Sequence, residues 1–348
     1  MNKKIKNILL ITPGFAKNEE DSTCIPALQD FVLGLNQYYP LLKITIITLH
    51  YPEKSRYYEW NGNKVYSIGA NNCRFPKRFL YWNKLKSQIR ELHKKESFDL
   101  IHTFWFDEVS YVVSKMKLDI LVYCTFMGQD ALGKNSYAKR IKLQEKRMIA
   151  LSQKQQNDIK KHLGLKVTEV IPWGVSALDI REVNKTIDLI NIGSFNEIKN
   201  QKEAIQIMAQ VVSIYPNLKC VLVGDGPFRA DLESEVISLN LSQNISFTGQ
   251  LDRKDVLELL GQSKILLHSS KYESFGMIFP EAVTCQTMIV SKEVGIAKKS
   301  DFWAIYSNPN DAVNQINEML IQPSYPIKSD LAKLSIKNTI DQYINFWK

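Results

Sequence analysis

Short apolar runs alternate with longer amphipathic segments along almost the whole chain, and this alternation strongly limits the possible folds. In the first half, apolar runs predict strands at 5–12, 44–49, 100–103, 120–125, 149–152 and 167–171. The segments between them predict helices at 26–38, 76–95, 106–116, 137–149 and 154–162. Strands separated by helices pair in parallel, with helices on both faces of the sheet. The first half therefore predicts a doubly wound α/β domain.

The second half of the chain repeats this pattern. Apolar runs predict strands at 187–192, 219–223, 245–248, 265–269 and 287–291. Helices are predicted at 202–215, 227–239, 254–262, from 281 onward, at 310–321 and at 330–347. The polar stretch 181–186 predicts a linker, and 348 residues suffice for two domains. We therefore predict one domain at 1–183, completed by the closing helix at 330–348, and a second at 184–329.

Composition excludes several classes of protein. No apolar run approaches the roughly 20 residues of a membrane span, and the first apolar run ends at Pro13-Gly14 without a signal-peptide cleavage site. The five cysteines are scattered singly, which is typical of reduced thiols in a cytoplasmic protein. The five histidines are equally dispersed, so no structural zinc site is predicted. We expect a cytoplasmic protein.

The net charge of +9 is unevenly distributed along the chain. Against one acid, the segment 73–95 carries eight basic residues, namely Arg74, Lys77, Arg78, Lys84, Lys86, Arg90, Lys94 and Lys95. Aromatic residues are interleaved with them, which is typical of a helix that rests peripherally on an anionic membrane surface. The same segment also fits a solvated basic helix whose aromatics lie in the core. Nucleic-acid binding is not expected, because it would need basic clusters elsewhere.

Two carboxylates, Glu273 and Glu281, flank seven mostly apolar residues between two predicted strands. This pattern predicts strand, loop, short helix and strand, with Glu273 in the loop and Glu281 in the helix. In an open α/β sheet such a loop lies at the carboxyl ends of the strands, where ligands bind. Gly276 allows close approach of the backbone, and free amides at the helix start point toward an anion. The alternative is a surface helix with two solvated glutamates.

Two further strand-end loops occur in the second half. The loop at 191–200 contains Gly193, which lets the turn approach a phosphate, and Lys199, a point charge at the start of the next helix. The loop at 223–229 contains Gly-Asp-Gly-Pro, starting at Gly224. It lacks the third glycine of the dinucleotide fingerprint, so that fingerprint is not met. Each loop alone is a weak signal, but three such loops in one domain would converge on one crevice.

In order and spacing, these motifs resemble the retaining glycosyltransferases of family 4. The resemblance rests on Gly193 with Lys199, on Gly224-Asp-Gly-Pro227, on Phe247-Thr-Gly249 and on the Glu-x7-Glu element. It extends over essentially the whole chain, with less specific landmarks in the first half. It implies the GT-B fold, in which two Rossmann-like doubly wound parallel-sheet domains face a cleft and a C-terminal helix closes back on the first domain.

The resemblance also implies roles for individual residues. Glu281 is expected to bind the ribose hydroxyls of a nucleotide, because a carboxylate offers only acceptors. The catalytic residues are expected to be Glu273, which orients the donor sugar, Lys199, which neutralises the departing diphosphate, and Asp130, near the sugar or the acceptor. Further contacts to the donor are expected from Gly14, Gly193, Ser194, Gly224, Gln250, Leu251, Ser274, Phe275, Gly276 and Met277.

The implied reaction transfers a sugar from a UDP- or GDP-sugar to a hydroxyl of a saccharide or lipid-linked acceptor, with retained anomeric configuration. Its implied setting is the synthesis of a cell-surface polysaccharide or glycolipid. The sequence contains no Asp-x-Asp motif, so neither a metal nor another cofactor is expected. Lys199 and helix amides would stabilise the leaving diphosphate instead.

The chain departs from the family pattern at several positions, among them the missing glycine in 284–287 and Trp173 where asparagine is common. Ser194 stands where arginine is common, and Arg229 or Arg253 is a candidate replacement. Met127 stands where histidine is common. These departures leave open a non-catalytic subunit of the same fold that supports a partner transferase. A nucleotide-sugar epimerase on the same architecture is a third hypothesis.

Several other polar and aromatic residues are assigned to structure rather than to chemistry. His102 and His268 adjoin predicted strand ends and could lie near the site, but a structural role is favoured for each. The acidic stretch 19–21 is predicted to be a solvated loop. Tyr343 and Trp347 are predicted to be core contacts of the closing helix.

Overall fold

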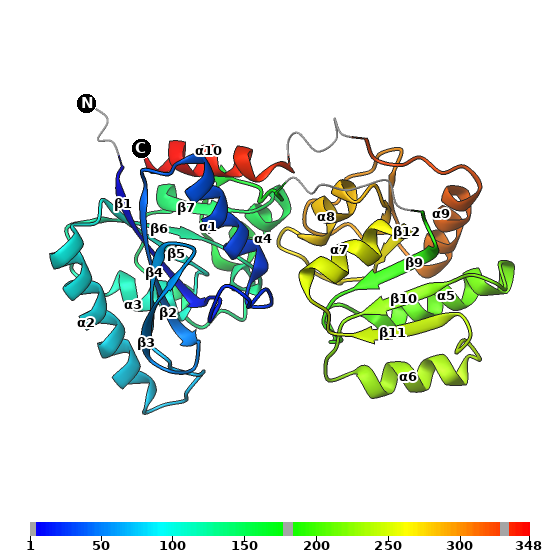
Figure 1. The fold of residues 1–348 in the computed structure, drawn as a ribbon, viewed down its shortest axis with the longest axis horizontal. Coiled ribbons are helices and arrows are strands. Elements are labelled where there is room, and N and C mark those ends of the chain that lie inside the picture. Colours follow the sequence, from blue (N-terminus) through cyan, green and yellow to red (C-terminus); the bar gives the residue numbers. More distant parts are fainter. Residues whose placement is uncertain (1–4, 177–183, 328–333) are drawn as a thin grey trace. The chain divides into compact units, whose positions relative to one another are not determined.

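The computed structural model describes residues 5–176, 184–327 and 334–348, which belong to two compact units (Figure 1). The first unit contains Met1–Ser176 and Ile336–Lys348, and the second contains Ala177–Ser335. The predicted domain boundaries, 183/184 and 329/330, adjoin or fall on residues that are not described. Part of the predicted linker 181–186 and the start of the predicted helix 330–347 also lie outside the described residues. These boundaries stay predictions.

An eight-stranded sheet forms the centre of the first unit, in the order β3-β4-β2-β1-β5-β6-β7-β8. All neighbouring strands are parallel except β3 and β4. The strands are β1 Asn7–Gly14, β2 Lys43–Tyr51, β3 Arg56–Trp60, β4 Asn63–Ser67, β5 Leu100–Phe104, β6 Leu121–Thr125, β7 Met148–Ala150 and β8 Glu169–Val170. The central strands β1 and β5 are almost continuously buried, because helices cover both faces of the sheet.

The helices of the first unit are α1 Pro26–Tyr38, α2 Arg78–Glu96, α3 Glu108–Ser114, α4 Gln153–Leu163 and α10 Ile336–Trp347. α10 lies beside α1 (Figure 1), and its Tyr343 and Trp347 are buried against Phe31 of α1. The predicted return of the closing helix to the first domain is therefore confirmed, and so are its core contacts.

The predicted helix at 137–149 is wrong. The structure has two short 3₁₀ turns there, Ala138–Arg140 and Glu145–Arg147, and then strand β7. Ile141 and Leu143, two residues apart, both pack against the same apolar cluster. Side chains two residues apart point the same way only in an extended chain, so packing overrides the helix propensity of this basic stretch.

The hairpin formed by β3 and β4 was not predicted from the strand-like runs. Its two strands are joined by Asn61-Gly62, and both residues have positive φ, 45° and 75°. A two-residue turn of this kind favours the Asn-Gly pair, because its twist matches that of the flanking antiparallel strands. The sequence signal for this hairpin was therefore Asn61-Gly62 rather than a hydrophobic run.

A six-stranded parallel sheet forms the second unit, in the order β11-β10-β9-β12-β13-β14. Its strands are β9 Ile187–Ile192, β10 Cys220–Val223, β11 Ile245–Gly249, β12 Ser263–His268, β13 Met288–Ser291 and β14 Trp303–Ile305. Its helices are α5 Gln201–Ile214, α6 Arg229–Ser238, α7 Arg253–Gly261, α8 Ile278–Thr284 and α9 Pro309–Ile321. Five of these strands and all five helices correspond to predicted elements, whereas β14 was not predicted.

Alternate residues of the central strands of this sheet face two different cores. Leu189 and Leu267 contribute to one cluster, with residues of α5, α6 and α9. Ile190 and Leu266 contribute to the other, with residues of α7 and α8. This two-residue alternation is what a strand buried on both faces produces. The second unit is thus doubly wound, as predicted.

The basic segment 73–95 is centred on α2, and its apolar residues divide between core and solvent. Trp82 is buried in the core, whereas Phe75, Phe79 and Leu80 are 76%, 48% and 70% exposed. Neither the membrane-surface hypothesis nor the hypothesis of a solvated helix with its aromatics in the core describes this segment fully. Trp82 lies in the core, whereas Phe75 and Phe79 are exposed to solvent. No helix within the described ranges is long and apolar enough to cross a membrane.

Candidate active site

The candidate site lies at the carboxyl edge of the second sheet, where the order of the strands reverses. From β9 the chain goes to β10 and β11 on one side, and it then returns to β12 on the other side of β9. The loops after β9 and β12 therefore leave neighbouring strands in opposite directions. Such a switch point opens a crevice in which α/β proteins bind ligands. Lys199 and Glu273 lie in these two loops.

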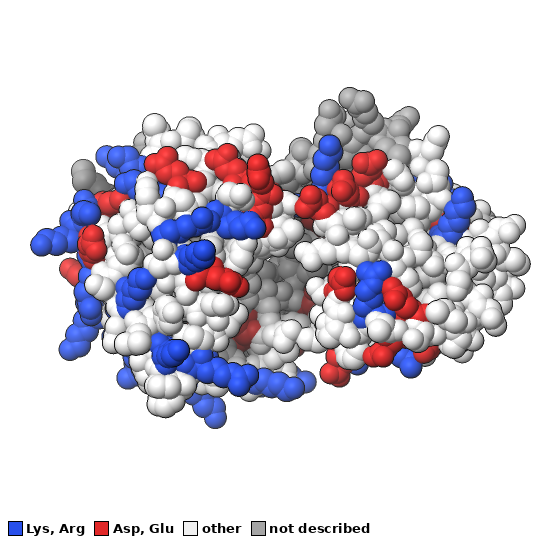
Figure 2. Space-filling view, turned by 60° about the horizontal axis from the view of Figure 1, so that its bottom comes forward, with Lys and Arg blue, Asp and Glu red and all other residues white. Residues whose placement is uncertain are grey.

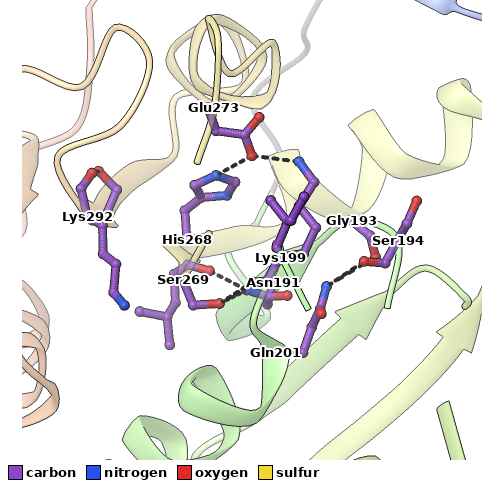
Figure 3. Close-up of polar contacts among 12 residues, drawn as sticks. Asn191, Gly193, Ser194, Lys199, Gln201, His268, Ser269, Glu273 and Lys292 are labelled. Atoms are coloured by element: carbon purple, nitrogen blue, oxygen red, sulfur yellow. Dashed lines mark hydrogen bonds and ion pairs between the residues drawn. The ribbon is translucent and has the colours of Figure 1, made fainter. Parts of the chain in front are cut away.

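Lys199 and Glu273 form an ion pair (Figure 3), with 2.6 Å between Nζ and Oε1. Their side chains are 29% and 14% exposed, so both still reach solvent. Burial alone would raise the pKa of the Glu273 carboxyl, but the hydrogen bond from His268 and the charge of Lys199 lower this pKa to about 2. Glu273 is therefore ionised at neutral pH and has no proton to donate.

His268, the last residue of β12, is the second partner of Glu273. Its Nε2 lies 3.0 Å from Oε1 of Glu273, and the ring is fully buried. Since an ionised carboxylate only accepts hydrogen bonds, Nε2 carries the proton. Burial lowers the pKa of His268, although Glu273 opposes this effect, so the ring is neutral. The sequence favoured a structural role for His268 and did not predict this contact, although its place at a strand end just before Glu273 left a position near the site open.

Hydrogen bonds within the loop after β9 fix the backbone that carries Lys199. Oδ1 of Asn196 accepts from the amides of Ile198 and Lys199, at 3.0 Å each. The hydroxyl of Ser269, which follows β12, donates to the carbonyl of Lys199 at 2.9 Å. The two loops of the switch point are thus joined through the backbone as well as through the ion pair.

The loops after β9, β10 and β11 meet at one end of the sheet. The amide of Gly193 donates to Val223 at 3.0 Å, and the amide of Gly224 donates to Gly249 at 3.0 Å. A Cβ on Gly224 would lie 2.1 Å from the carbonyl oxygen of Gly193, and φ of Gly224 is +137°. Glycine is therefore required at 224 by the approach of two protein loops, whereas the motifs had predicted a contact between Gly224 and the donor.

Glu281 lies in the first turn of α8 and forms an ion pair with Arg253, the first residue of α7. Their closest atoms, Oε1 and Nη2, are 3.0 Å apart, and both side chains are mostly buried. Arg253 was a candidate replacement for the arginine missing at Ser194, but its observed partner is Glu281. The other candidate, Arg229, contacts Glu233 at 2.8 Å. Both arginines thus have carboxylate partners, and Ser194 is exposed.

The stretch between Glu273 and α8 presents backbone amides. Among the described residues, the amides of Phe275, Gly276 and Met277 donate to no acceptor. Gly276 has φ +85°, and a Cβ on it would lie 2.6 Å from the ring of Phe279. The loop after β13 supports this stretch, because the amide of Ile296 donates to the carbonyl of Phe275 at 3.0 Å. The predicted backbone donors therefore have no partner within the described part of the chain.

The other predicted donor-binding residues lie around the same edge of the second unit. Ser274 is partly buried beside Glu273, and Gln250 is exposed just after β11. Leu251 is partly buried and packs against the cluster of α7 and α8. Within the described part of the chain, no group of three or more His, Cys, Asp or Glu side chains could hold a metal ion.

Of the predicted site residues of the first unit, Gly14 ends β1 and Asp130 lies in a 3₁₀ turn, Gln129–Ala131, that follows β6. Gly14 is buried, and the amide after it, of Phe15, donates to Tyr51 at 3.1 Å. Asp130 is also buried, and its carboxylate accepts from the amides of Phe106, Met127 and Gly128 at 2.7, 3.2 and 2.6 Å. Burial raises the pKa of Asp130, and these hydrogen bonds oppose the rise. The observed contacts of Asp130 hold two loops together.

Asp21 contradicts the prediction of a solvated acidic stretch at 19–21. Its side chain is buried and accepts from the amides of Lys17, Thr23 and Cys24 and from the hydroxyl of Tyr51. It folds the loop after β1 around itself. Glu19 and Glu20 are exposed, as predicted for this stretch. Three consecutive acids look alike in the sequence, so only the tertiary contacts show that Asp21 is buried.

Comparison with known proteins places this architecture in a family. Residues 179–332 match the model of glycosyl transferases group 1, and residues 42–177 match the model of glycosyltransferase family 4. The two matches cover both units. The chain belongs to the family 4 glycosyltransferases, as its motifs indicated.

This chain matches only part of the length of each curated relative. N-acetyl-alpha-D-glucosaminyl L-malate synthase of Bacillus anthracis is 34% identical over 107 residues, which are 31% of this chain and 27% of that protein. The phosphatidylinositol N-acetylglucosaminyltransferase GPI3 subunit of Saccharomyces cerevisiae is 25% identical over 178 residues, which are 47% of this chain and 39% of that protein. The matched regions thus span less than half of these relatives.

Solved structures share the fold over nearly the whole chain. Sucrose-phosphate synthase from Thermosynechococcus elongatus has a TM-score of 0.70 at 18% identity, covering 99% of this chain and 95% of that one. Anabaena Alr3699/HepE in complex with UDP and glucose has a TM-score of 0.66 at 16% identity, covering 98% and 95%. The predicted GT-B fold is confirmed by these similarities.

Proposed function

We propose that the protein is a retaining, metal-independent glycosyltransferase that moves a sugar from a UDP- or GDP-sugar to an acceptor hydroxyl. The observation that carries this proposal is the Lys199–Glu273 pair at the switch point between β9 and β12. The pair offers a cation for a diphosphate and a carboxylate for sugar hydroxyls within one crevice. The proposed acceptor is a saccharide or a lipid-linked molecule in the synthesis of a cell-surface polysaccharide or glycolipid.

Each part of the donor has a proposed partner. The diphosphate binds Lys199 and the free amides of Phe275, Gly276 and Met277. The sugar hydroxyls bind Glu273, and the ribose hydroxyls displace Arg253 from part of the Glu281 carboxylate. The base lies near Gln250 and Leu251. We assign a contact to the diphosphate to Gly14 of the first unit, and a contact to the sugar or the acceptor to Asp130, as the motifs predicted.

The proposed reaction uses the substrate as its own base. The bond from the anomeric carbon to the diphosphate oxygen breaks while the acceptor oxygen forms a bond to the same face of that carbon. The acceptor proton passes to the departing phosphate oxygen. Lys199 and the amides stabilise the charge that develops on that oxygen. Glu273 takes no part in proton transfer, since the pKa of its carboxyl is lowered to about 2.

The names of similar proteins support a nucleotide-sugar donor. Two curated relatives carry the N-acetylglucosaminyl group in their names, and HepE was solved with UDP and glucose. UDP-N-acetylglucosamine is therefore the first donor to test.

A donor panel tests the proposed function. The protein is incubated with UDP-, GDP- and ADP-sugars, with and without EDTA, and the products are identified by NMR. We expect nucleotide release from one donor class, no effect of the chelator, and a product with the donor's anomeric configuration. Inversion, or strict dependence on a divalent metal, would contradict the mechanism. Absence of nucleotide binding would favour the non-catalytic subunit, and a change at C2 of the sugar without acceptor would identify an epimerase.

We also propose that the segment around α2 rests on an anionic membrane surface. Phe75, Phe79 and Leu80 are exposed beside Lys77 and Lys84, which are exposed as well. Lys and Arg side chains gather over the face of the first unit seen at the left of Figure 2. Exposed apolar groups within a basic surface are what an interfacial segment needs. A lipid-linked acceptor would be reached from such a surface.

Vesicle sedimentation separates the contributions of charge and of apolar contact. The wild type is expected to bind vesicles that contain phosphatidylglycerol and to remain free with pure phosphatidylcholine. Phe75→Ser with Leu80→Ser, and separately Lys77→Gln with Lys84→Gln, should each weaken binding. Arg78 is left intact, because its Nε lies 3.3 Å from the buried Glu108. Equal binding by all variants would exclude this surface.

A further inference from the structure

The single N–H donor of the neutral His268 ring points at Glu273. It ends β12, the central strand beside β9, and its ring packs edge-on against Phe279 of α8, with 4.8 Å between centroids. Its backbone carbonyl accepts from the amide of Lys292 at 3.3 Å. The backbone of His268 is therefore fixed by the strand and a neighbouring loop, its ring is packed on a helix, and Nε2 faces the Glu273 carboxylate (Figure 3).

Both donors to Glu273 use the same oxygen. Nζ of Lys199 lies 2.6 Å from Oε1, and Nε2 of His268 lies 3.0 Å from Oε1. Among the described residues, no donor is within hydrogen-bond distance of Oε2 of Glu273, which Figure 3 shows pointing away from both partners. The carboxylate thus has one oxygen fixed by the protein and one open to a ligand.

The two donors differ in what a diphosphate would do to them. Lys199 is a flexible cation that is 29% exposed, and a diphosphate would compete with Glu273 for it. The His268 ring is neutral, so a phosphate does not attract it, and the ring is buried and fixed by packing, so a phosphate does not contact it. When Lys199 turns to the diphosphate, His268 is the remaining donor that holds Oε1.

We propose that His268 is a positioning residue, which keeps Oε1 of Glu273 fixed so that Oε2 faces a hydroxyl of the donor sugar. This inference rests on the proposed function, because it presupposes a nucleotide-sugar in the crevice. It assigns the histidine to recognition of the sugar and not of the nucleotide. A neutral donor suits this role, because a second cation beside Glu273 would compete with Lys199 for the phosphate.

Two substitutions at position 268 test the proposal. His268→Leu removes the donor and retains an apolar side chain, whereas His268→Gln retains an N–H near the position of Nε2. Affinities for UDP and for UDP-N-acetylglucosamine are measured by calorimetry, with GDP and GDP-mannose used if the wild type prefers guanine. His268→Leu should weaken the nucleotide-sugar about tenfold, the loss of one hydrogen bond to a charged group, and leave the nucleotide within about twofold. His268→Gln should recover most of the loss.

A pH profile distinguishes positioning from general damage to the fold. Among the described residues, the charged or titratable groups that face Glu273 are Lys199 and His268. Removing His268 removes one of the two groups that lower the pKa of Glu273. The nucleotide-sugar affinity of His268→Leu should therefore fall at a higher pH than that of the wild type, and His268→Gln should restore the wild-type profile. His102→Gln, a buried histidine of the first unit, serves as the matched control and should change neither affinity.

The outcomes separate the two proposals. If the wild type binds no nucleotide or nucleotide-sugar, the proposed function fails. If the wild type binds and His268→Leu matches it for both ligands at every pH, only the role of His268 is overturned. An equal loss of nucleotide and nucleotide-sugar affinity in His268→Leu would also overturn it, because a merely structural residue acts on both.

Discussion

His102 and His268 are buried histidines on central strands of the two sheets, and they are used differently. His102 of β5 bonds to the hydroxyl of Thr125 through Nε2 at 2.8 Å and to the indole of Trp347 through Nδ1 at 3.0 Å. His268 of β12 bonds to Glu273, a loop carboxylate that also contacts a cation. The first histidine joins a strand to the closing helix, whereas the second points at the candidate site.

Two carboxylates predicted or found near strand-end loops in each unit differ in the same way. In the first unit, Asp21 and Asp130 are buried and accept mainly from backbone amides. In the second unit, Glu273 and Glu281 accept from the side chains of cations. Side chains can turn toward a ligand, but loop backbones cannot move without refolding the loop. For these four carboxylates, cationic side-chain partners accompany the candidate site, whereas backbone amide partners accompany structural roles.

The largest expected effect comes from Lys199, and a second lysine in the same unit provides the control. Lys199→Met removes the only cation that we assign to the diphosphate, so transfer should fall about 10²- to 10³-fold. Lys264 pairs with Asp188 at 2.7 Å near the opposite, amino ends of β12 and β9. Lys264→Met should leave transfer within about twofold. The measurement is release of UDP or GDP under saturating donor.

Equal activity of both lysine variants would break the comparison. It would mean that the edge with the Lys199–Glu273 pair is no different from the edge with the Lys264–Asp188 pair.

A pair of carboxylate substitutions should separate binding from stability. Glu281→Ala removes charge-assisted hydrogen bonds to the ribose, so nucleotide affinity should fall by about 1.5–3 kcal/mol. Asp21→Ala leaves several amides without an acceptor, so the first unit should lose about 2–4 kcal/mol of stability while nucleotide affinity is unchanged. Calorimetry measures the first effect. Tryptophan fluorescence in urea measures the second, because five of the six tryptophans belong to the first unit.

Arg253→Ala is the control for the Glu281 prediction. If Glu281 serves only its ion pair with Arg253, both variants will bind nucleotide equally well. If Glu281 binds ribose, Glu281→Ala will bind more weakly than Arg253→Ala.

The smallest effect concerns pH and His102. Burial lowers the pKa of His102 from 6.5 to about 3. Between these pH values His102 binds a proton in the unfolded chain but not in the folded protein. The contribution of His102 to the free energy of unfolding is therefore highest above pH 6.5, and it falls as the pH is lowered below that value. His102→Gln should lower stability at pH 7, through lost packing, but should lose less between pH 7 and pH 5 than the wild type. Urea unfolding followed by fluorescence checks this, and an unchanged pH slope would contradict the assignment.

Much of the fold could be predicted from the sequence, because buried parallel strands carry a strong apolar signal. The failures have specific causes. The helix at 137–149 failed because Ile141 and Leu143 pack as an extended chain, and the β3–β4 hairpin was missed because its signal was the turn Asn61-Gly62. In the site, Lys199 and Glu273 could be predicted from their motifs. The contacts of Glu281 with Arg253 and of Glu273 with His268 depend on side-chain geometry that no spacing rule supplies.

A crystal structure with bound UDP or GDP, whichever binds more tightly, tests the central claim most directly. We predict that the diphosphate lies between the loops after β9 and β12, with Nζ of Lys199 turned from Glu273 to a phosphate oxygen and His268 still bonded to Oε1. A nucleotide bound elsewhere, or a Lys199–Glu273 pair that remains closed beside the bound diphosphate, would contradict it.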